Sequence, residues 1–271
     1  MARLRLCIVL ALFCACSGDR RPRLVVGTTH TVEDSGLLAV LVNEYAEAYA
    51  SDHRVSVIVA GSGEILAMAQ RGDVDVVLSH SPEAEAALLA SGRVVSREPV
   101  MRNHFVLLGP PSDPASAGSA STAAAAFRQV AAARQPFVSR GDDSGTHRME
   151  LAVWSRARVE PAWDGYIEAG TGMADALRLA SERGGYILSD VATYEAMRGE
   201  LDLGIVHERS NELPNEYSVL IVADARNPDG ARTFADWLMN ERARELIAGY
   251  RTPGSGRALF IPAARRERQH D

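Results

Sequence analysis

The sequence predicts an α/β fold of two lobes, in which each lobe holds a mainly parallel sheet flanked by helices. Short apolar runs that are typical of buried strands alternate with amphipathic helices along most of the 271 residues. Four of the strands end in a turn rich in Gly, Ser and Thr that opens a helix. Two of these turns lie in the first half of the chain, at 28–36 and 61–63, and two in the second half, at 140–146 and 170–172. This repetition predicts two similar lobes that face each other across a cleft.

The first half of the chain provides most of the first lobe. Asp34 or Ser35 is expected to be the N-cap of the first helix, because both residue types accept hydrogen bonds from free N–H groups at a helix start. Pro82 is typical of the first turn of a helix. The expected strands are 24–28, 55–60, 74–79 and 105–108, and the expected helices are 37–49, 64–71 and 83–91.

The second half repeats the alternation after a loop rich in Pro, Ser and Gly. The expected strands are 136–139, 166–168, 185–190 and 217–223, and the expected helices are 122–134, one that ends near 158, 173–183, 191–198 and 231–246. The predicted first lobe comprises 24–106 with 216–262, and the predicted second lobe comprises 107–215. Residues 263–271 are charged and are expected to form a disordered tail.

The N-terminal segment reads MARLRLCIVLALFCACSGDRR and resembles a bacterial lipoprotein signal. Two arginines precede an apolar run that is too short to span a bilayer, and a small residue precedes Cys16. Residues 1–15 are the predicted signal peptide, Cys16 is the predicted lipidation site, and 16–23 is the predicted linker. A plain secretory signal cleaved nearby is the alternative. The protein is expected to be exported to the periplasm or cell surface and to meet a membrane through its lipid anchor only.

Composition and charge argue against several classes of function. The formal net charge of −6 argues against a nucleic-acid binder, because such proteins carry a basic face. All 29 basic residues are arginine, so a phosphate-binding loop of the nucleotide-hydrolase type has no lysine to use. The histidines are scattered without the short spacings of a metal site. Neither a metal nor a cofactor is expected.

The segment SRGDDSGTH, at 139–147, has the composition of an oxyanion site. Glycine lets a ligand approach the backbone, and hydroxyl groups with free N–H groups at a helix start donate hydrogen bonds to an anion. Arg140 adds a donor that is always charged. Asp142 and Asp143 are expected to cap the following helix or to hold the guanidinium of Arg140 rather than to contact the ligand.

A serine hydrolase is the alternative from a different class. Ser144 would be its nucleophile, with His147 or His30 as the base. Ser144 and His147 lie three residues apart at a helix start, and no acid is placed to orient the base. The composition therefore favours binding over catalysis.

Six segments, in this order, resemble the extracytoplasmic tungstate-binding proteins of ABC transporters. They read TTHTVEDSGLL, GSGEIL, GDVDVVLSHSPEAE, FVSRGDDSGTH, EAGTGMADAL and YILSDVATY, and the resemblance runs from about 25 to 262. It implies the type II periplasmic binding protein fold, with two lobes that close on the ligand. It also implies delivery of a small oxyanion to an ABC transporter permease, and we expect the protein to be a monomer.

The resemblance carries the ligand-binding residues over position by position. Those expected to bind the oxyanion are Thr29, Thr31, Ser62, Gly63, Arg140, Ser144, Gly145 and Thr146, with Thr28 and His30 as additional candidates. His30 stands where the family has a small hydroxyl residue, Thr31 where serine is common, and Val191 where a more polar residue is usual. A histidine in the cleft would make ligand binding depend on pH.

The resemblance favours tungstate, and molybdate is nearly the same size. Sulfate is a further dianion that needs donors only. Phosphate carries a proton at neutral pH, so a phosphate site benefits from an acceptor carboxylate, for which Asp142, Asp143 and Asp190 are candidates. A sensor that signals the bound state to a partner other than a permease is a third hypothesis.

Overall fold

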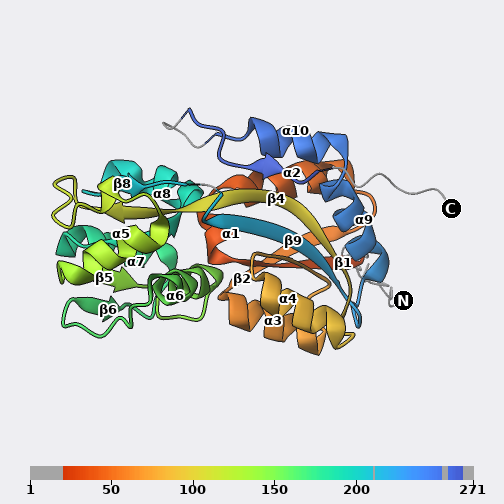
Figure 1. Ribbon diagram of the computed structural model, residues 1–271. Coiled ribbons are helices and arrows are strands. Elements are labelled where there is room, and N and C mark those ends of the chain that lie inside the picture. Colours follow the sequence, from red (N-terminus) through yellow and green to blue (C-terminus); the bar gives the residue numbers. More distant parts are fainter. Residues whose placement is uncertain (1–20, 210, 252–255, 265–271) are drawn as a thin grey trace, which may run out of the picture.

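Two lobes share the long strand β4 (Val94–Gly109), which crosses from one to the other (Figure 1). The computed structural model describes residues 21–209, 211–251 and 256–264. Strand β9 (Pro214–Val222) returns from the second lobe and pairs antiparallel with β4 along the first. The predicted signal peptide, Cys16 and nearly all of the predicted tail lie outside the described residues.

The sheet of the first lobe has a parallel half and an antiparallel half. Strand β1 (Arg23–Thr29) lies between β2 (Arg54–Ala60) and β3 (Val76–Ser79) and is parallel to both. Strand β9 is antiparallel to β3, and β10 (Ile261–Pro262) is antiparallel to β4. The ends of β1, β2 and β3 therefore meet at one edge of the sheet.

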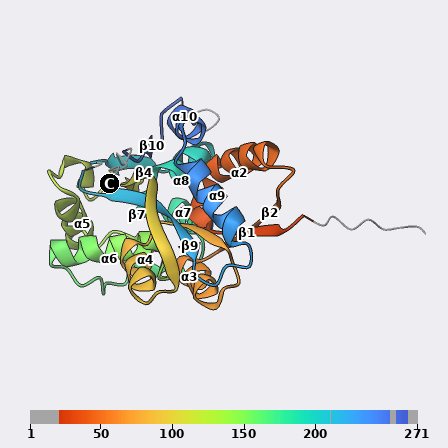
Figure 2. The same cartoon turned by 90° about the vertical axis from the view of Figure 1, so that its right-hand side faces the viewer.

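Helices cover both faces of this sheet (Figure 2). The side chains of a strand alternate between its two faces, so Val26 packs toward one layer of helices and Val25 toward the other. The first layer contains α2 (Leu37–Ala48), α9 (Pro228–Leu238) and α10 (Glu241–Gly249), and the second contains α3 (Ser62–Arg71) and α4 (Pro82–Ala90).

The second lobe repeats this architecture with shorter strands. Strands β7 (Ile187–Asp190) and β8 (Gly204–His207) pair antiparallel with β4. Strand β5 (Phe137–Ser139) is parallel to β6 (Tyr166–Glu168), and a parallel bridge between Phe137 and Tyr186 joins β5 to the segment before β7. The helices are α5 (Ala123–Ala132) and α6 (Gly145–Ala157) on one face, α7 (Met173–Arg183) and α8 (Val191–Met197) on the other, and the short helices Ala117–Ser119 and Arg198–Glu200.

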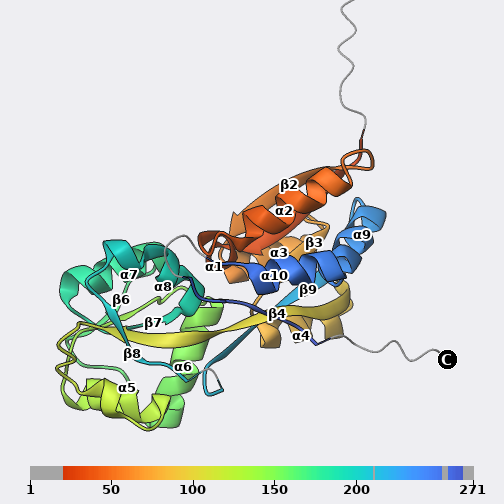
Figure 3. The same cartoon turned by 90° about the horizontal axis from the view of Figure 1, so that it is seen from above.

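The first turn of the chain differs from its prediction. It contains a short helix, α1 (His30–Asp34), so Asp34 and Ser35 end a helix, although the Ser35 hydroxyl accepts from Leu37 N at 3.3 Å. The N-cap of α2 is Gly36, whose φ of 79° is left-handed. Glycine adopts this conformation without the steric cost of a Cβ atom. In Figure 3, α1 lies beside α8 at the boundary between the lobes.

Two further predictions are corrected, and two strands were missed. The expected helix 231–246 is two helices, because the Asn240 side chain accepts a hydrogen bond from Ala243 N and starts α10. Strand β4 begins at Val94, well before the predicted 105, and its register shifts at Pro99. Strands β8 and β10 were not predicted. No helix in the described part of the chain is long and apolar enough to span a membrane.

Candidate functional site

The strand ends of the first lobe bring three loops together. Thr29 at the end of β1 pairs with Ala60 at the end of β2, and Thr28 pairs with Leu78 near the end of β3. The parallel register therefore places Thr29, the turn at 61–63 and the loop at 79–81 along one edge of the sheet. This edge is where ligands bind in open α/β sheets.

The second lobe presents a matching edge. Ser139 at the end of β5 pairs with Glu168 at the end of β6, and β7 ends beside them at Asp190. Loops that begin with Arg140 and Ala169 follow β5 and β6, and α8 follows β7 directly at Val191. Helices α6 and α7 start from these loops, so together with α8 three helix N-termini lie at this edge.

The two edges face each other. A Cβ atom built on Gly145, at the start of α6, would lie 2.7 Å from the backbone oxygen of His80, which follows β3. Helix α1 of the first lobe contacts α7 and α8 of the second. Arg140 interacts electrostatically with both Asp34 and His80 across the boundary. The lobes therefore enclose Arg140 between them.

Four of the predicted site residues carry a buried hydrogen-bonding group that has no partner among the described residues. These groups are Thr29 Oγ1, Ser62 Oγ, Arg140 Nη1 and Thr146 Oγ1. Burying a polar group without a partner costs about 1–3 kcal/mol, and more for a charged one. Two of the groups belong to each lobe, and each can donate a hydrogen bond. The set lacks only an acceptor, which an anion in the cleft would supply.

The guanidinium of Arg140 is held rigidly. Its Nε donates to the backbone oxygen of Thr171 at 2.9 Å, and its Nη2 pairs with the carboxylate of Asp142. Asp142 also accepts from Ser144 N at 3.2 Å, so it both fixes the guanidinium and shapes the turn, as predicted. Asp143 instead pairs with Arg148 at 2.8 Å. Nη1 of Arg140 is the group that remains for a ligand.

Helix N-termini supply further donors. The side chain of Ser144 caps α6 by accepting from His147 N, whereas Gly145 N and Thr146 N have no acceptor among the described residues. Helices α3 and α7 have no side-chain cap. Free N–H groups and the positive end of the helix dipole both favour an anion.

Comparison with known proteins agrees with this geometry. Residues 18–242 match a family model described as a PBP superfamily domain. This chain belongs to the PBP superfamily. The match confirms the predicted fold class, with two lobes of mixed α/β structure.

Three similar proteins place the chain more closely. It is 36% identical to "Tungstate-binding protein TupA" of Peptoclostridium acidaminophilum, over 89% of this chain and 86% of the relative. It is 40% identical to a "Putative ABC transporter anion-binding protein" of Haloferax volcanii, over 92% of this chain and 74% of the relative. The crystal structure titled as the tungstate ABC transporter from Geobacter sulfurreducens is 38% identical, with a TM-score of 0.78, and the match covers 84% of this chain and 98% of that chain. The resemblance to tungstate-binding proteins is thereby confirmed.

The remaining predicted site residues occupy different environments. Thr31 is buried in α1. A Cβ atom on Gly63 would meet nothing within 4 Å, so the backbone at this position is open to a ligand. Thr28 Oγ1 already donates to Leu78 O at 3.0 Å. The side chain of His30 is 46% exposed and lies 3.9 Å from Glu33.

The sequence-based prediction missed the loop after β3. Ser79 Oγ, His80 Nε2 and Ser81 Oγ are all buried without a partner among the described residues. The loop lacks glycine, which marked the other turns. Its signal was nevertheless present, because a strand is followed by Ser-His-Ser-Pro at a helix start. The parallel pairing of β1 with β3 is what places this loop beside Thr29.

Several ionisable groups near the site have displaced pKa values. Burial, and then the nearby Asp190, raise the pKa of Asp34 to about 6. Burial raises the pKa of Glu150, behind the β5–α6 turn, to about 7. Burial lowers the pKa of His80 to about 4, so its ring is neutral at neutral pH. In the described part of the chain, no group of three or more His, Cys, Asp or Glu residues is arranged to hold a metal ion.

Proposed function

We propose that this protein is an exported solute-binding protein that captures tungstate between its lobes and delivers it to an ABC transporter permease. The observation that carries the proposal is the set of four buried donors, two from each lobe, that have no acceptor among the described residues. A ligand that accepts from both lobes at once would stabilise their closed arrangement.

The described carboxylates favour a fully deprotonated dianion over phosphate. A phosphate site needs an acceptor for the proton of the ligand. Asp142 is engaged with Arg140 and Asp143 with Arg148. Asp190 accepts from the N–H groups at the start of α8, from a threonine hydroxyl and from Asn103. The three acceptor candidates are therefore already used by the protein.

Among the dianions we propose tungstate as the ligand, because the descriptions of two of the three similar proteins name tungstate. Molybdate has the same charge and nearly the same size, so we expect it to compete. Sulfate is smaller, and its oxygens would not reach donors on both lobes as well.

A binding role also fits Ser144 better than catalysis does. Its hydroxyl accepts from His147 N and caps α6, and His147 Nδ1 accepts from Asp143 N at 3.0 Å. No hydrogen bond joins the Ser144 hydroxyl to a histidine ring among the described residues. The geometry therefore offers a helix cap and no activated nucleophile.

The accompanying proposals concern the location of the protein and its partners. The protein is exported, carries a lipid on Cys16, acts as a monomer and needs no cofactor. The lipid would keep it near the permease that it supplies.

Calorimetric titration with tungstate, molybdate, sulfate and phosphate tests the function. We expect tight binding of tungstate and molybdate and much weaker binding of the other two. Phosphate binding tighter than tungstate binding would assign another oxyanion, and an absence of heat with all four would reject an oxyanion site. Hydrolysis of a p-nitrophenyl ester, abolished in Ser144→Ala, would favour the hydrolase.

A further inference from the structure

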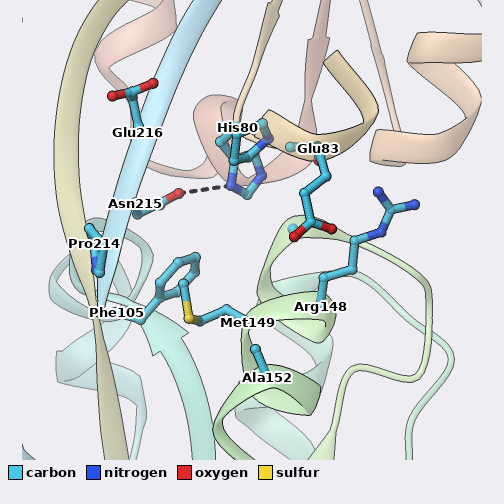
Figure 4. A pocket seen from close by; sticks show the side chains of 12 residues that line it. His80, Glu83, Phe105, Arg148, Met149, Ala152, Pro214, Asn215 and Glu216 are labelled. Carbon is cyan, nitrogen blue, oxygen red and sulfur yellow. Dashed lines mark hydrogen bonds between the residues drawn. The ribbon is translucent and has the colours of Figure 1, made fainter. Parts of the chain in front are cut away.

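A cavity of about 420 Å³ lies in the cleft beside the candidate oxyanion site (Figure 4). His80 and Glu83 approach it from the first lobe, and Met149 approaches from α6 of the second. Its walls are mainly apolar. Apolar residues that line it are Pro82, Phe105, Met149, Ala152 and Pro214. A space of this size is within the range that holds small organic ligands.

The cavity and the oxyanion site meet at two residues. Gly145 lines the cavity, and its N–H also opens α6, where the anion is expected. His80 lines the cavity as well, and its ring interacts electrostatically with Arg140 and Asp142 of the oxyanion site. Thr29, Ser62, Arg140 and Thr146 do not line the cavity, whereas Ser81, whose hydroxyl also has no partner among the described residues, does.

The ring of His80 fills the junction. The side chain is 3% exposed. Its Cε1 and Nδ1 lie 3.0 Å from the position of a Cβ atom on Gly145, so the ring packs against the first turn of α6. On another side it stacks on Tyr217, with ring centroids 5.2 Å apart. An anion that carried a bulky group past Gly145 would collide with this ring.

A chain of amides holds the ring in place. Asp190 caps α8 as an acceptor, so Asn103 presents its NH₂ group to it, at 3.3 Å. The oxygen of Asn103 then faces the NH₂ group of Asn215 at 2.8 Å. The oxygen of Asn215 is left to accept from His80 Nδ1 at 3.0 Å. The chain thus links the second lobe to the end of β3 and fixes the orientation of the ring.

The same chain determines the proton on the ring. Because Asn215 presents its oxygen, Nδ1 of His80 carries the hydrogen, and Nε2 of the neutral ring carries a lone pair. Nε2 has no partner among the described residues. His80 therefore adds no positive charge for the anion, and its contribution is steric.

We propose that His80 is a specificity-determining residue whose ring separates the oxyanion site from the adjoining apolar cavity and so restricts the ligand to bare tetrahedral oxyanions. The inference rests on the proposed oxyanion-binding function. It predicts that a smaller side chain at this position admits an oxyanion with an apolar substituent, because the substituent gains an apolar cavity to occupy.

The probe is phenylphosphonate, an oxyanion with an apolar substituent. It is used at mildly alkaline pH, where it is a dianion. Titration calorimetry compares the unaltered protein, His80→Ala and Met149→Ala. We expect His80→Ala to bind phenylphosphonate about tenfold more tightly than the unaltered protein does. Met149→Ala is the matched control, since it enlarges the same cavity from its far wall and leaves the ring in place. It should show no gain.

Three results would overturn the proposal: no gain in His80→Ala, an equal gain in Met149→Ala, or binding of phenylphosphonate by the unaltered protein as tight as its binding of tungstate. His80→Ser, which also removes the ring and leaves a small polar side chain, is the second variant should the alanine variant not fold. A crystal structure of the unaltered protein with tungstate tests the same point without substitution, and an open passage from the anion to the cavity would contradict it.

The tungstate titrations separate this proposal from the proposed function. Tungstate binding by the unaltered protein without a phenylphosphonate gain in the variant rejects only the role of His80. A phenylphosphonate gain without any tungstate binding keeps the role of His80 and rejects tungstate as the ligand.

Discussion

Nη2 of Arg140 pairs with the carboxylate of Asp142, and this pairing leaves Nη1 as a buried cationic donor without a described partner. A carboxylate next to an anion site is unfavourable in isolation. Here Asp142 fixes the plane of the guanidinium and keeps it from rotating away from the cleft. Asp142 therefore contributes to the site by orienting Arg140, although Asp142 itself is not expected to contact the ligand.

Replacing Arg140 should remove most of the tungstate affinity. A hydrogen bond to a charged group contributes about 1.5–3 kcal/mol, so we expect Arg140→Ala to bind at least about 100-fold more weakly in calorimetry. Arg156→Ala is the control, because it removes an exposed arginine from the same lobe. Equal affinities of the two variants would exclude Arg140 from the site.

Removing one unpartnered hydroxyl should change affinity and stability in opposite directions. Thr146→Val keeps the shape of the side chain and removes a buried group without a described partner. We expect about 5-fold weaker tungstate binding and a ligand-free protein that is more stable by up to about 1 kcal/mol, measured by calorimetry and by urea unfolding.

Thr28→Val is the matched control for this variant. Its hydroxyl already donates to Leu78 O, so its removal should destabilise the ligand-free protein instead. A loss of stability in Thr146→Val similar to that in Thr28→Val would show that the Thr146 hydroxyl has a partner within the protein.

The sequence predicted those parts of the site that carry a local signal. The turns with glycine and hydroxyl residues, and Arg140 at the start of one of them, follow from composition at helix starts. The loop of His80 did not stand out, because its importance depends on β3 lying next to β1 and on Asn215, which is 135 residues away along the chain. No local pattern reports such a contact.

Two elements were predicted to the residue. Strand β6 and helix α7 have the predicted bounds. Strand β4 was predicted too short because its first half carries charged residues and Pro99, and pairing with β9 holds it extended despite them. The exposure of the His30 side chain was also not predictable, since the short helix α1 that contains it was not predicted.

Glu150 should make the stability of the protein depend on pH. Its carboxyl group accepts from Trp154 Nε1 and Tyr166 OH, and burial raises its pKa from 4.5 to about 7. Between these values the folded protein holds a proton that the unfolded chain has released. The free energy of unfolding therefore falls as the pH rises through this window.

Glu150→Gln removes this titration and keeps an oxygen for both donors. We expect a flatter dependence of the unfolding free energy on pH, by on the order of 1–3 kcal/mol across the window, in urea unfolding at a series of pH values. A residual slope of the same sign should remain, because the pKa of Asp34 is also raised, to about 6. An unchanged slope would show that Glu150 is ionised throughout.

Because the lobes approach each other closely at Gly145, we expect this position not to tolerate a side chain. A Cβ atom there would lie 2.7 Å from His80 O, a distance that the backbone cannot accept without moving the lobes apart. Gly145→Ala should therefore bind tungstate about tenfold more weakly, and its scattering profile should contract less on ligand addition than that of the unaltered protein.

Gly199→Ala provides the comparison, because nothing lies within 4 Å of its added Cβ atom. Its affinity and its contraction should match those of the unaltered protein. We expect the two variants to differ because Gly145 lies where the lobes touch and its N–H is also a candidate donor to the ligand. A shift of this residue would therefore disturb both closure and binding. If Gly145→Ala closed fully and bound tungstate with unaltered affinity, the contact between His80 and α6 would not belong to the ligand-bound state.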